Sequence, residues 1–507
     1  MKEPDVLTIP AVWRRIATTS GSNTHLVLPG GQEVTYAQTY LRARQLAKHF
    51  TDVGLGPGDR ILSLLGNCRE LYEFYIACGL VGAVAVPVNI MGTRREILAL
   101  AADCSAKGVV ARAELVGNVP EGLDVRVAVG GEPEGWHSYE GILEEPARDE
   151  APVAPNDPAI IIYSSGTTGL PKGIVLSHRG LVVNAQLASQ ALGYTSEDTL
   201  ISVLPSYSSF GFSWDFLQLA LVGMRLVLLP AFSPDEALDL IERYGVTSIA
   251  GVPTVFVRMF SEERTQGRRL ESLRLLDVGG GPVPDLLKKR IRDRFGIEVV
   301  ESYGLTEISP VATVERVGQP TPPGSCGPPL PGIEVRVVDG QGQDMPLGET
   351  GELLFRSETV MLGYLNNPRE TATALRGGWL HTGDLGRVDE DGNVFIVDRI
   401  KELIVTSGYN VYPKEVESVL FSHPGVQSIA VVGLPDETRG ENVHAFVVPQ
   451  TGVAVTAEDL LAHAREHLSL YKVPRGITFV EELPLTASGK IRKFRLVEQA
   501  VQSGDSP

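Results

Sequence analysis

Short apolar runs alternate with amphipathic segments along most of the first 300 residues, and this alternation limits the fold more than any other sequence feature. Residues 35–52 carry helical spacing after a threonine, which predicts a helix. Beyond it the alternation predicts strands at 60–65, 83–88, 108–111, 200–204, 225–229, 248–252 and 273–278, with helices at 71–81, 93–102, 214–222, 234–244 and 254–260. Strands alternating with helices of this length predict parallel α/β layers.

The pattern changes after about Gly324 to short strands with turns, predicted at 334–338, 351–356 and 393–397. These strands indicate a β-rich subdomain. Further on, the sequence predicts helices at 413–421 and 457–467 and strands at 426–432 and 443–448. We therefore expect an α/β fold in two domains. A large N-terminal domain of layered α/β subdomains plus the β-rich subdomain would span residues 1–398, and a small mobile α+β C-terminal domain would span residues 399–507.

Overall composition limits the partners of this chain. The net charge of −17 and the pI near 5.1 argue against nucleic acid, because phosphate backbones recruit basic surfaces. The four cysteines show no C-x-x-C spacing and are expected to be buried thiols in a reducing compartment. The most apolar run, 76–90, is short and broken by Pro87, so no transmembrane segment is expected. Without a secretory signal either, we expect a cytoplasmic protein, and a homodimer is left open.

A loop rich in glycine and hydroxyl groups follows the apolar run 159–162. Over residues 163–173 it places Lys172 after a run of small and hydroxyl-bearing residues, Ser164, Ser165, Gly166, Thr167, Thr168 and Gly169. Exposed backbone N–H groups, hydroxyl donors and a mobile ammonium together suit a polyphosphate. The loop is not a Walker motif, because Pro171 precedes the lysine and Gly173 stands where serine or threonine would bind magnesium. A surface turn of the same composition is the alternative.

Five further stretches carry groups suited to nucleotide chemistry, at 301–307, 351–353, 379–385, 398–413 and 484–491. The first offers an aromatic ring and a carboxylate, and the last a lysine after glycine. In this order, with the glycine loop, they resemble the adenylate-forming superfamily of acyl-CoA synthetases, luciferases and nonribosomal peptide synthetase adenylation domains. The resemblance spans Thr35 to Leu496, and the D-R-I-K-E-L-I wording from Asp398 is similar to that of the AMP-binding acyl- and aryl-CoA synthetases.

The resemblance implies an enzyme that joins a carboxylic acid to the α-phosphate of ATP, releases pyrophosphate and then transfers the acyl group to coenzyme A. It implies ATP, Mg²⁺ and coenzyme A as cofactors. Tyr303 would stack on adenine, Asp384 would accept hydrogen bonds from the ribose hydroxyls, and Arg399 would support the ribose. Other ATP contacts would come from the glycine loop and from Gly280, Gly281, Pro282, Ser302, Gly304 and Thr306. A core tyrosine and a plain Gly-Asp turn are the alternatives for Tyr303 and Asp384.

The resemblance assigns catalysis to Lys490, Glu307 and Thr168. The Lys490 ammonium would bridge the substrate carboxylate and the α-phosphate, and Glu307 would hold Mg²⁺. A solvated surface lysine is the alternative for Lys490. Lys401 stands at the hinge about which the C-terminal domain would rotate, and Gly408 stands beside the tunnel for the pantetheine arm of coenzyme A.

The residues expected around the acyl group are mostly apolar or aromatic: Tyr207, Ser208, Phe210, Trp214, Val252, Gly279, Leu305 and Val311. This set holds no arginine to pair a second carboxylate, which favours a hydrophobic monocarboxylic acid, aryl or alkyl. Ser208 departs from the family, which usually has histidine there; Gly281 and Lys493 replace a usual alanine and arginine. One alternative is a stand-alone acyl-adenylating enzyme that loads a carrier protein or performs only the adenylation half-reaction. The other is an inactive scaffold, against which the intact Lys172, Glu307, Asp384 and Lys490 argue.

Overall fold

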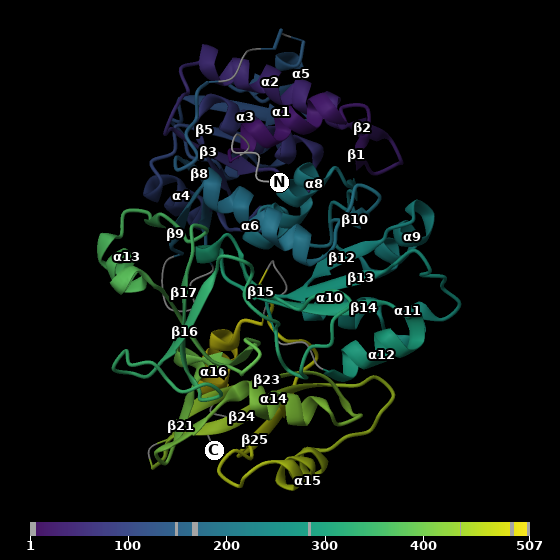
Figure 1. Cartoon of the computed structure of the whole chain (residues 1–507), viewed down its shortest axis with the longest axis vertical. Helices are drawn as coiled ribbons and strands as arrows, with labels where there is room; N and C mark the ends of the chain where they lie inside the picture. Colours follow the sequence, from purple (N-terminus) through teal and green to yellow (C-terminus); the bar gives the residue numbers. More distant parts are fainter. Residues whose placement is uncertain are drawn as a thin grey trace.

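The chain builds four sheets; in Figure 1 the first lies at the upper left, the second on the right, the third on the left below the first, and the C-terminal sheet at the bottom. The structure is a computed structural model that describes residues 7–144, 146–147, 151–164, 171–281, 285–436, 438–486 and 491–503. No helix in these ranges is long and apolar enough to cross a membrane.

The first sheet has eight strands, in the spatial order β18 (Gly363–Tyr364), β9 (Gly173–Ser177), β8 (Pro158–Tyr163), β4 (Val84–Pro87), β3 (Arg60–Leu64), β5 (Gly108–Arg112), β6 (Val125–Val129) and β7 (His137–Ser138). Its neighbours from β8 to β7 are parallel, while β9 and β18 extend it in antiparallel fashion. Its helices are α2 (Tyr36–Asp52), α3 (Arg69–Val81), α4 (Arg94–Asp103) and α5 (Tyr139–Ile142), with a 3₁₀ turn η1 (Ala113–Asn118). The helices predicted at 35–52 and 93–102 are confirmed as α2 and α4, and the structure adds a capping box at the start of each, on Thr35 and Thr93.

The second sheet also has eight strands, in the order β15 (Val311–Val314), β14 (Glu298–Gly304), β13 (Leu275–Gly279), β12 (Ser248–Gly251), β10 (Thr199–Ile201), β11 (Arg225–Val227), β1 (Thr24–Val27) and β2 (Glu33–Thr35). It is parallel from β14 to β1 and antiparallel at both edges. Its helices are α1 (Ile9–Thr19), α6 (His178–Ala191), α9 (Pro234–Tyr244), α10 (Pro253–Met259), α11 (Glu262–Thr265) and α12 (Asp285–Phe295). Helices α3 and α6 are largely buried, and one apolar core joins the first two sheets.

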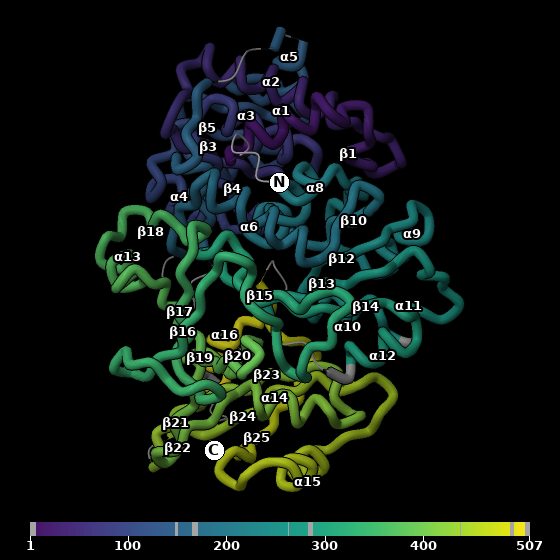
Figure 2. Tube along the Cα trace, in the orientation of Figure 1, coloured from purple at the N-terminus to yellow at the C-terminus, as the bar shows by residue number. Residues whose placement is uncertain are grey.

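The β-rich subdomain is a four-stranded antiparallel sheet of β16 (Glu334–Val338), β17 (Gly351–Arg356), β19 (Leu380–Val388) and β20 (Val394–Arg399). Before β19 lie α13 (Pro368–Ala374) and η4 (Arg376–Gly378). Figure 2 shows α13 and β18 beside α4, and the Asn366 amide donates to the Asp103 carbonyl across 263 positions of sequence. This return of the chain to the first sheet brings distant residues into one site.

The C-terminal sheet has its own apolar cores. Its strands are β22 (Tyr409–Val411), β21 (Ile404–Thr406), β24 (Gly440–Pro449), β23 (Val426–Asp436) and β25 (Gly476–Phe479), covered by α14 (Pro413–Phe421), α15 (Ala457–His467) and α16 (Lys493–Ser503). The predicted strands and helices of this region are confirmed, whereas α16 was not predicted.

The predicted helix at 214–222 begins earlier than its sequence pattern indicates. A continuous helical segment runs through α7 (Ser209–Phe212), the π-helical turn η2 (Ser213–Gln218) and α8 (Leu219–Val222). The predicted strand at 200–204 is correspondingly shorter, ending at Ile201. Turns of π-helix tend to occur at functional sites, and this one contains Trp214, which is expected beside the acyl group.

Candidate active site

The glycine loop joins two antiparallel strands of the first sheet, β8 and β9. At its base, the Ser164 N–H donates to the Lys172 carbonyl at 3.0 Å. Five residues expected to bind phosphate here, Ser165, Gly166, Thr167, Thr168 and Gly169, lie outside the described residues. The Lys172 ammonium lies 2.5 Å from a Glu370 oxygen on α13 and 5.1 Å from the centre of the Tyr364 ring. Lys172 therefore contacts two residues, Glu370 and Tyr364, that the sequence did not identify.

The stretches expected around adenine meet at the ends of β13 and β14. Gly279 on β13 is paired with Ser302 on β14, so Gly280 and Gly281 follow directly beside Tyr303 and Gly304. A Cβ on Gly304 would lie 1.8 Å from the Pro310 carbonyl oxygen, which requires glycine there. A Cβ on Gly281 would meet only ordinary contacts with Pro253, so this departure from the family costs the site little. Pro282 lies outside the described residues.

Both carboxylate oxygens of Asp384 have partners in the structure. The Tyr303 hydroxyl donates to one carboxylate oxygen of Asp384 at 2.6 Å, and the Arg399 guanidinium lies 3.2 Å from the other. The Thr382 hydroxyl accepts from the Asp384 N–H at 3.0 Å. Asp384 is only 5% exposed and lies within β19, paired with Arg399 of β20. A plain Gly-Asp turn does not account for a carboxylate that is buried and held on both oxygens.

Glu307 lies in the 3₁₀ turn η3 (Thr306–Ile308) after β14. The Tyr364 hydroxyl donates to a Glu307 oxygen at 2.9 Å, and Lys172 packs over the same tyrosine ring. Burial raises the pKa of Tyr364 well above its ordinary value, and the neighbouring Glu307 charge raises it further, so the phenol stays a donor. Thr306 is held by its hydroxyl, 2.9 Å from that of Ser209. One ring thus links the expected metal-binding carboxylate to the loop lysine.

Two of the three aromatic residues expected around the acyl group, Phe210 and Trp214, pack together. The rings of Phe210 and Trp214 meet edge to face with centres 4.5 Å apart, one helical turn from each other. A Cβ on Gly279 would lie 3.3 Å from the Phe210 ring. The Tyr207 hydroxyl donates to the Asn89 side chain at 3.0 Å. Phe210 and Gly279 are therefore adjacent, and any Cβ at position 279 would crowd the ring.

Three more residues of the expected acyl site lie at strand ends of the second sheet. Val252 follows β12 and caps α10, and Leu305 joins β14 to η3. Val311 begins β15, where its backbone N–H and carbonyl are both bonded to the Asn184 side chain of α6. Val252 and Val311 are buried and Leu305 is partly buried.

Ser208 has a local structural task that its sequence does not reveal. Its hydroxyl accepts from the Gly211 N–H at 3.1 Å and donates to the Pro205 carbonyl at 2.7 Å, so it caps the start of α7. A histidine at this position would lose the cap.

The junction between the third sheet and the C-terminal sheet carries the expected hinge. Lys401 is exposed in the 3₁₀ turn η5 (Ile400–Glu402). Next to it, Glu402 lies 3.0 Å from the ammonium of Lys493, which also lies 2.9 Å from Glu417. Lys493 is thus well paired in place of the usual arginine: burial opposes its charge, but the two carboxylates raise its pKa.

Gly408 lies in the tight turn between β21 and β22, with φ of +82° after a Ser407 φ of +50°. Such a turn favours glycine on its own account, and a Cβ on Gly408 would have no atom within 4 Å. Lys490 lies outside the described residues. The chain on either side of it is closed by a bridge between Leu485 and Ile491. The pKa of the Glu96 carboxyl on α4 is lowered mainly by its hydrogen bonds with Thr93, with a smaller contribution from the charge of Arg492.

Sequence reasoning missed five polar residues of this region, Asn89, Asp215, Asp277, Tyr364 and Glu370. Asn89, Tyr364 and Glu370 act through long-range contacts, which the sequence does not encode locally. Burial raises the pKa of Asp215 to about 8 and that of Asp277 to about 7. A carboxylate inside an otherwise apolar run was the available signal for Asp277.

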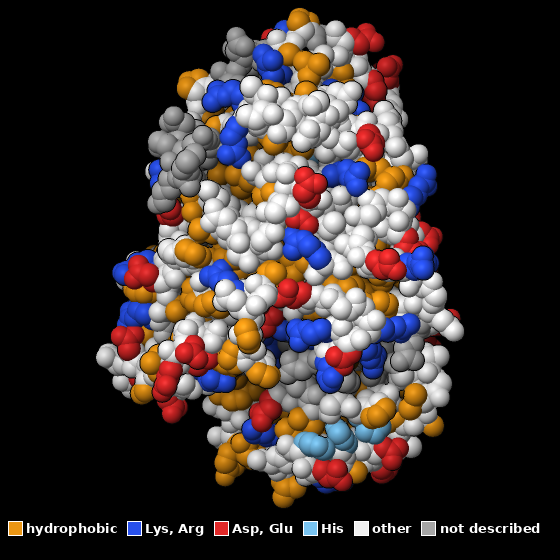
Figure 3. All heavy atoms as spheres, turned by 45° about the vertical axis from the view of Figure 1, so that its right-hand side comes forward, with side chains coloured by type: hydrophobic (Ala, Val, Ile, Leu, Met, Phe, Trp, Pro, Cys, Tyr) orange, Lys and Arg blue, Asp and Glu red, His pale blue; other side chains and the backbone are white. Residues whose placement is uncertain are grey.

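The histidines support no metal site. No group of three or more His, Cys, Asp or Glu within the described ranges is placed to hold a metal ion. In Figure 3 histidines gather at the C-terminal end of the molecule. The ring of His463 on α15 contacts the Ser422 hydroxyl and the Val419 carbonyl, so it ties α15 to α14.

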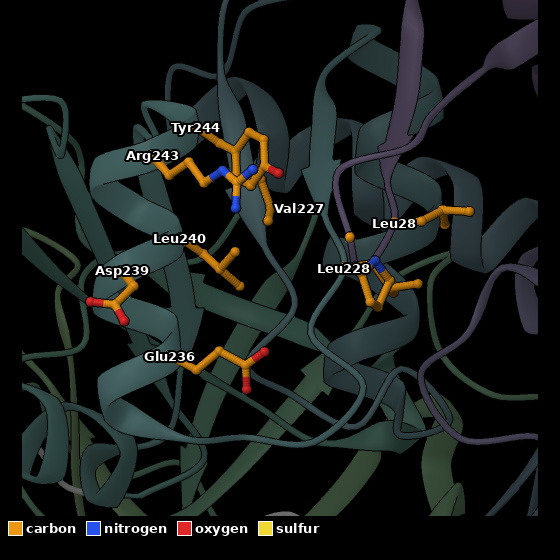
Figure 4. Close-up of a pocket in the computed structure, with 10 residues that line it drawn as sticks. Leu28, Val227, Leu228, Glu236, Asp239, Leu240, Arg243 and Tyr244 are labelled. Carbon is orange, nitrogen blue, oxygen red and sulfur yellow. The ribbon is translucent and has the colours of Figure 1, made fainter.

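A cavity of about 280 Å³ lies elsewhere, between β11 and α9 (Figure 4). Leu228 and Leu240 line it together with the charged side chains of Glu236, Asp239 and Arg243. It contains none of the residues expected to bind ATP or an acid, so it is separate from the candidate active site.

Comparison with known proteins agrees with this geometry. The model of the AMP-binding enzyme family matches residues 13–365, and that of the AMP-binding enzyme C-terminal domain matches residues 415–490. A feruloyl-CoA synthase from Amycolatopsis sp is 36% identical over 468 residues, which cover 92% of this chain and 93% of that protein. A fatty acid–[acyl-carrier-protein] ligase from Streptomyces coeruleorubidus is 34% identical, over 97% of each chain.

The fold is shared as well as the sequence. The crystal structure of an anthranilate CoA ligase in complex with anthranoyl-AMP matches with a TM-score of 0.91 at 29% identity, covering 98% of each chain. The predicted α/β fold, with a large N-terminal and a small C-terminal domain, is confirmed.

Proposed function

Because this chain belongs to the AMP-binding enzyme family of the adenylate-forming superfamily, we propose that it is an AMP-forming acid–thiol ligase for a mainly apolar carboxylic acid. In the first step a carboxylate oxygen of the acid attacks the α-phosphorus of ATP, and pyrophosphate leaves. In the second step the thiol sulfur of coenzyme A attacks the acyl carbon, its proton is lost, and AMP leaves. Both steps bring anions together, so cations and hydrogen-bond donors must offset their repulsion.

The observation that carries the proposal is the Tyr303–Asp384–Arg399 arrangement. A buried carboxylate, ordered on both oxygens and next to an aromatic ring, suits an adenosine whose ribose hydroxyls donate and whose base stacks. The Gly280–Gly281 backbone at the end of β13 would form the facing wall.

The remaining polar residues would bind the phosphate groups and border the nucleotide. Lys172 and the glycine loop would bind the β- and γ-phosphates, and Lys490 would neutralise charge developing between the carboxylate and the α-phosphate. Ser302, Gly304 and Thr306 would border the nucleotide. Thr168 would contribute a hydroxyl from the loop. The salt bridge from Lys172 to Glu370 supports a role in which ATP exchanges one anionic partner of this lysine for another.

Glu307 suits Mg²⁺ held jointly with phosphate. Its carboxylate is oriented by Tyr364, and Mg²⁺ typically takes one or two carboxylates while keeping water and phosphate oxygens. Bound there, the ion would neutralise phosphate charge and orient the triphosphate.

Two domains would carry the two steps, with boundaries at residues 1–398 and 399–507. Separate apolar cores on either side of this boundary support the division. Rotation at Lys401 would withdraw Lys490 after adenylation and bring Gly408 to the site.

A carrier protein is the second candidate acceptor. Its support is the 34% identity to a fatty acid–[acyl-carrier-protein] ligase over nearly the whole chain, together with serine in place of histidine at position 208. In both cases the chemistry of adenylation is the same, and only the carrier of the attacking thiol differs.

Pyrophosphate release across a panel of aryl and alkyl carboxylic acids tests the proposal. The reactions are run with ATP and Mg²⁺, and then with coenzyme A, with a phosphopantetheinylated carrier protein or with neither added. We expect acid-dependent pyrophosphate release in all three and an acyl thioester with coenzyme A. A thioester with the carrier protein alone would select the second candidate, and no release with any acid would refute the proposed function.

A further inference from the structure

Residues 361–365 form a short segment that we call the bridging segment, because it is hydrogen-bonded to η3 at one end and to β9 at the other. The Met361 N–H donates to the Glu307 carbonyl at 2.8 Å. The Leu365 N–H donates to the Gly173 carbonyl at 2.7 Å, and β18, within the segment, pairs with β9. The bridging segment therefore connects the turn that carries Glu307 to the strand that begins directly after the loop lysine.

Tyr364, in the bridging segment, contacts two side chains of opposite charge. Its hydroxyl donates to one oxygen of Glu307 at 2.9 Å, and the Lys172 ammonium lies over its ring, 5.1 Å from the ring centre. The Tyr364 N–H donates to the Thr371 hydroxyl at 2.9 Å, on the same helix α13 whose Glu370 is paired with Lys172. The backbone of Tyr364 is thus held in place, while its hydroxyl contacts the carboxylate and its ring contacts the cation.

The bond from Tyr364 occupies only one oxygen of Glu307. Within the described ranges, the other oxygen of this carboxylate makes no hydrogen bond or ion pair. A carboxylate that is oriented through one oxygen can offer the second to a hard cation such as Mg²⁺. The phenol donates a proton to the carboxylate and carries no positive charge, so it orients Glu307 without neutralising it.

We propose that Tyr364 is a positioning residue that makes Mg²⁺ and the triphosphate of ATP bind as one unit. This inference rests on the proposed function and assigns the coupling between its metal and its nucleotide to one side chain. The hydroxyl orients Glu307 for the ion, and the ring holds the Lys172 ammonium beside the phosphates. Because both protein groups are held by the same phenol before ATP binds, the complex of ion and nucleotide is favoured over the nucleotide alone.

The test measures ATP binding without an acid, so that no turnover is needed. The Kd for ATP is determined by equilibrium dialysis, once with excess EDTA and once with saturating Mg²⁺. We call the first Kd divided by the second the metal coupling ratio. Tyr364→Phe keeps the ring and removes the hydroxyl, so it should lower this ratio by about 10-fold and leave the Kd in EDTA nearly unchanged. Tyr364→Leu removes the ring as well and should also raise the Kd in EDTA by about 2- to 5-fold.

Double variants show whether Tyr364 acts through the two side chains that it contacts. Glu307→Gln should lower the metal coupling ratio at least as much as Tyr364→Phe, and combining the two should lower it no further. Lys172→Met should raise the Kd in EDTA, and adding Tyr364→Leu should raise it no further. A tyrosine with a purely structural role would change the stability of the fold and leave the metal coupling ratio unaltered.

Tyr139→Phe is the matched control. Tyr139 also donates its hydroxyl to a carboxylate, that of Glu73, but it begins α5 next to β7, at the opposite edge of the same sheet from β18. Both of its Kd values should equal those of the wild type. If Tyr364→Leu does not fold, Tyr364→Phe alone decides, since it removes a single hydroxyl group.

Three results would overturn the inference: a wild-type metal coupling ratio near one, an unchanged ratio in Tyr364→Phe, or effects of Tyr364→Phe and Glu307→Gln that add. If the wild-type protein binds no ATP under either condition and releases no pyrophosphate with any acid, the proposed function itself is refuted.

Discussion

Replacing Tyr303 with phenylalanine tests the nucleotide site by removing a single hydroxyl group. The substitution keeps the ring and removes the hydroxyl that donates to Asp384 at 2.6 Å. Asp384 is 5% exposed, so water does not easily replace this donor, while Arg399 and Thr382 remain in place. A hydrogen bond to a charged group contributes about 1.5–3 kcal/mol, which corresponds to an increase of about 10- to 150-fold in the KM for ATP. The KM for the acid should change little.

Tyr303→Ala extends the measurement to the ring. It removes the same hydroxyl and also the stacking surface, worth about 0.5–1.5 kcal/mol beyond burial. The KM for ATP should therefore rise by a further factor of about 2 to 10 over the phenylalanine variant. Both are measured by ATP–pyrophosphate exchange at saturating acid. Tyr244→Phe, in the remote cavity between β11 and α9, is the control and should match the wild type.

A nucleotide analogue locates the effect on the ribose. If Tyr303 acts by orienting Asp384, the wild-type enzyme should prefer ATP strongly over 2′,3′-dideoxy-ATP, and Tyr303→Phe should lose most of that preference. An undiminished preference in Tyr303→Phe, or equal changes in the KM values for ATP and acid, would refute the assignment of Asp384 to the ribose and leave Tyr303 a core tyrosine.

Three further substitutions test other parts of the site. Lys490→Ala should slow adenylation by the equivalent of about 3–4 kcal/mol, while a supplied acyl-adenylate is still converted to thioester. Adenylation at a near wild-type rate would show that this lysine is not catalytic. Ser208→His and Ser208→Ala should both lose the cap of α7 and about 1 kcal/mol of stability. Only the histidine variant should accelerate thioester formation in a single turnover. Equal rates in the two variants would show that position 208 has no role in the thiol step. Asp215 has a pKa of about 8 in the fold against an ordinary 3.8, so its contribution to stability is full below pH 3.8 and is lost as the pH rises toward 8. Relative to the wild type, the free energy of unfolding of Asp215→Asn in urea should therefore rise by about 1–3 kcal/mol between pH 5.5 and pH 7.5. If the free energies of unfolding of the two proteins change in parallel with pH, Asp215 titrates normally.

The sequence predicted what local pattern controls. The helices that begin near Thr35 and Thr93 and the alternation of strands and helices follow from neighbouring residues, and they appear in the structure nearly as expected. Helix α6 was missed because its residues are apolar on most sides: it is buried between sheets and shows no clean polar face. Likewise the start of α7 depends on the Ser208 cap, and its serine was read as part of the site alone.

Contacts between residues that are far apart in the sequence could not be predicted from local patterns. Tyr364 reaches Glu307 because β18 pairs antiparallel with β9, about 190 positions away, and no local pattern specifies that pairing. The partner of Lys172, Glu370, follows from the same pairing. By contrast, Tyr303, Asp384 and Arg399 were each identified from motifs, and the structure adds that they touch.

The position of these three residues explains how one site could serve two steps. Asp384 and Arg399 are paired across β19 and β20 of one sheet, and both precede Lys401 in the chain. Under the proposed rotation at Lys401, the carboxylate, its guanidinium and Tyr303 would therefore stay together, whereas the residues that follow Lys401 would move. The adenosine would remain held by the same contacts while the catalytic lysine is exchanged for the thiol, so the intermediate would not have to be released between the steps. A ribose contact placed beyond residue 401 would have broken in the middle of the reaction.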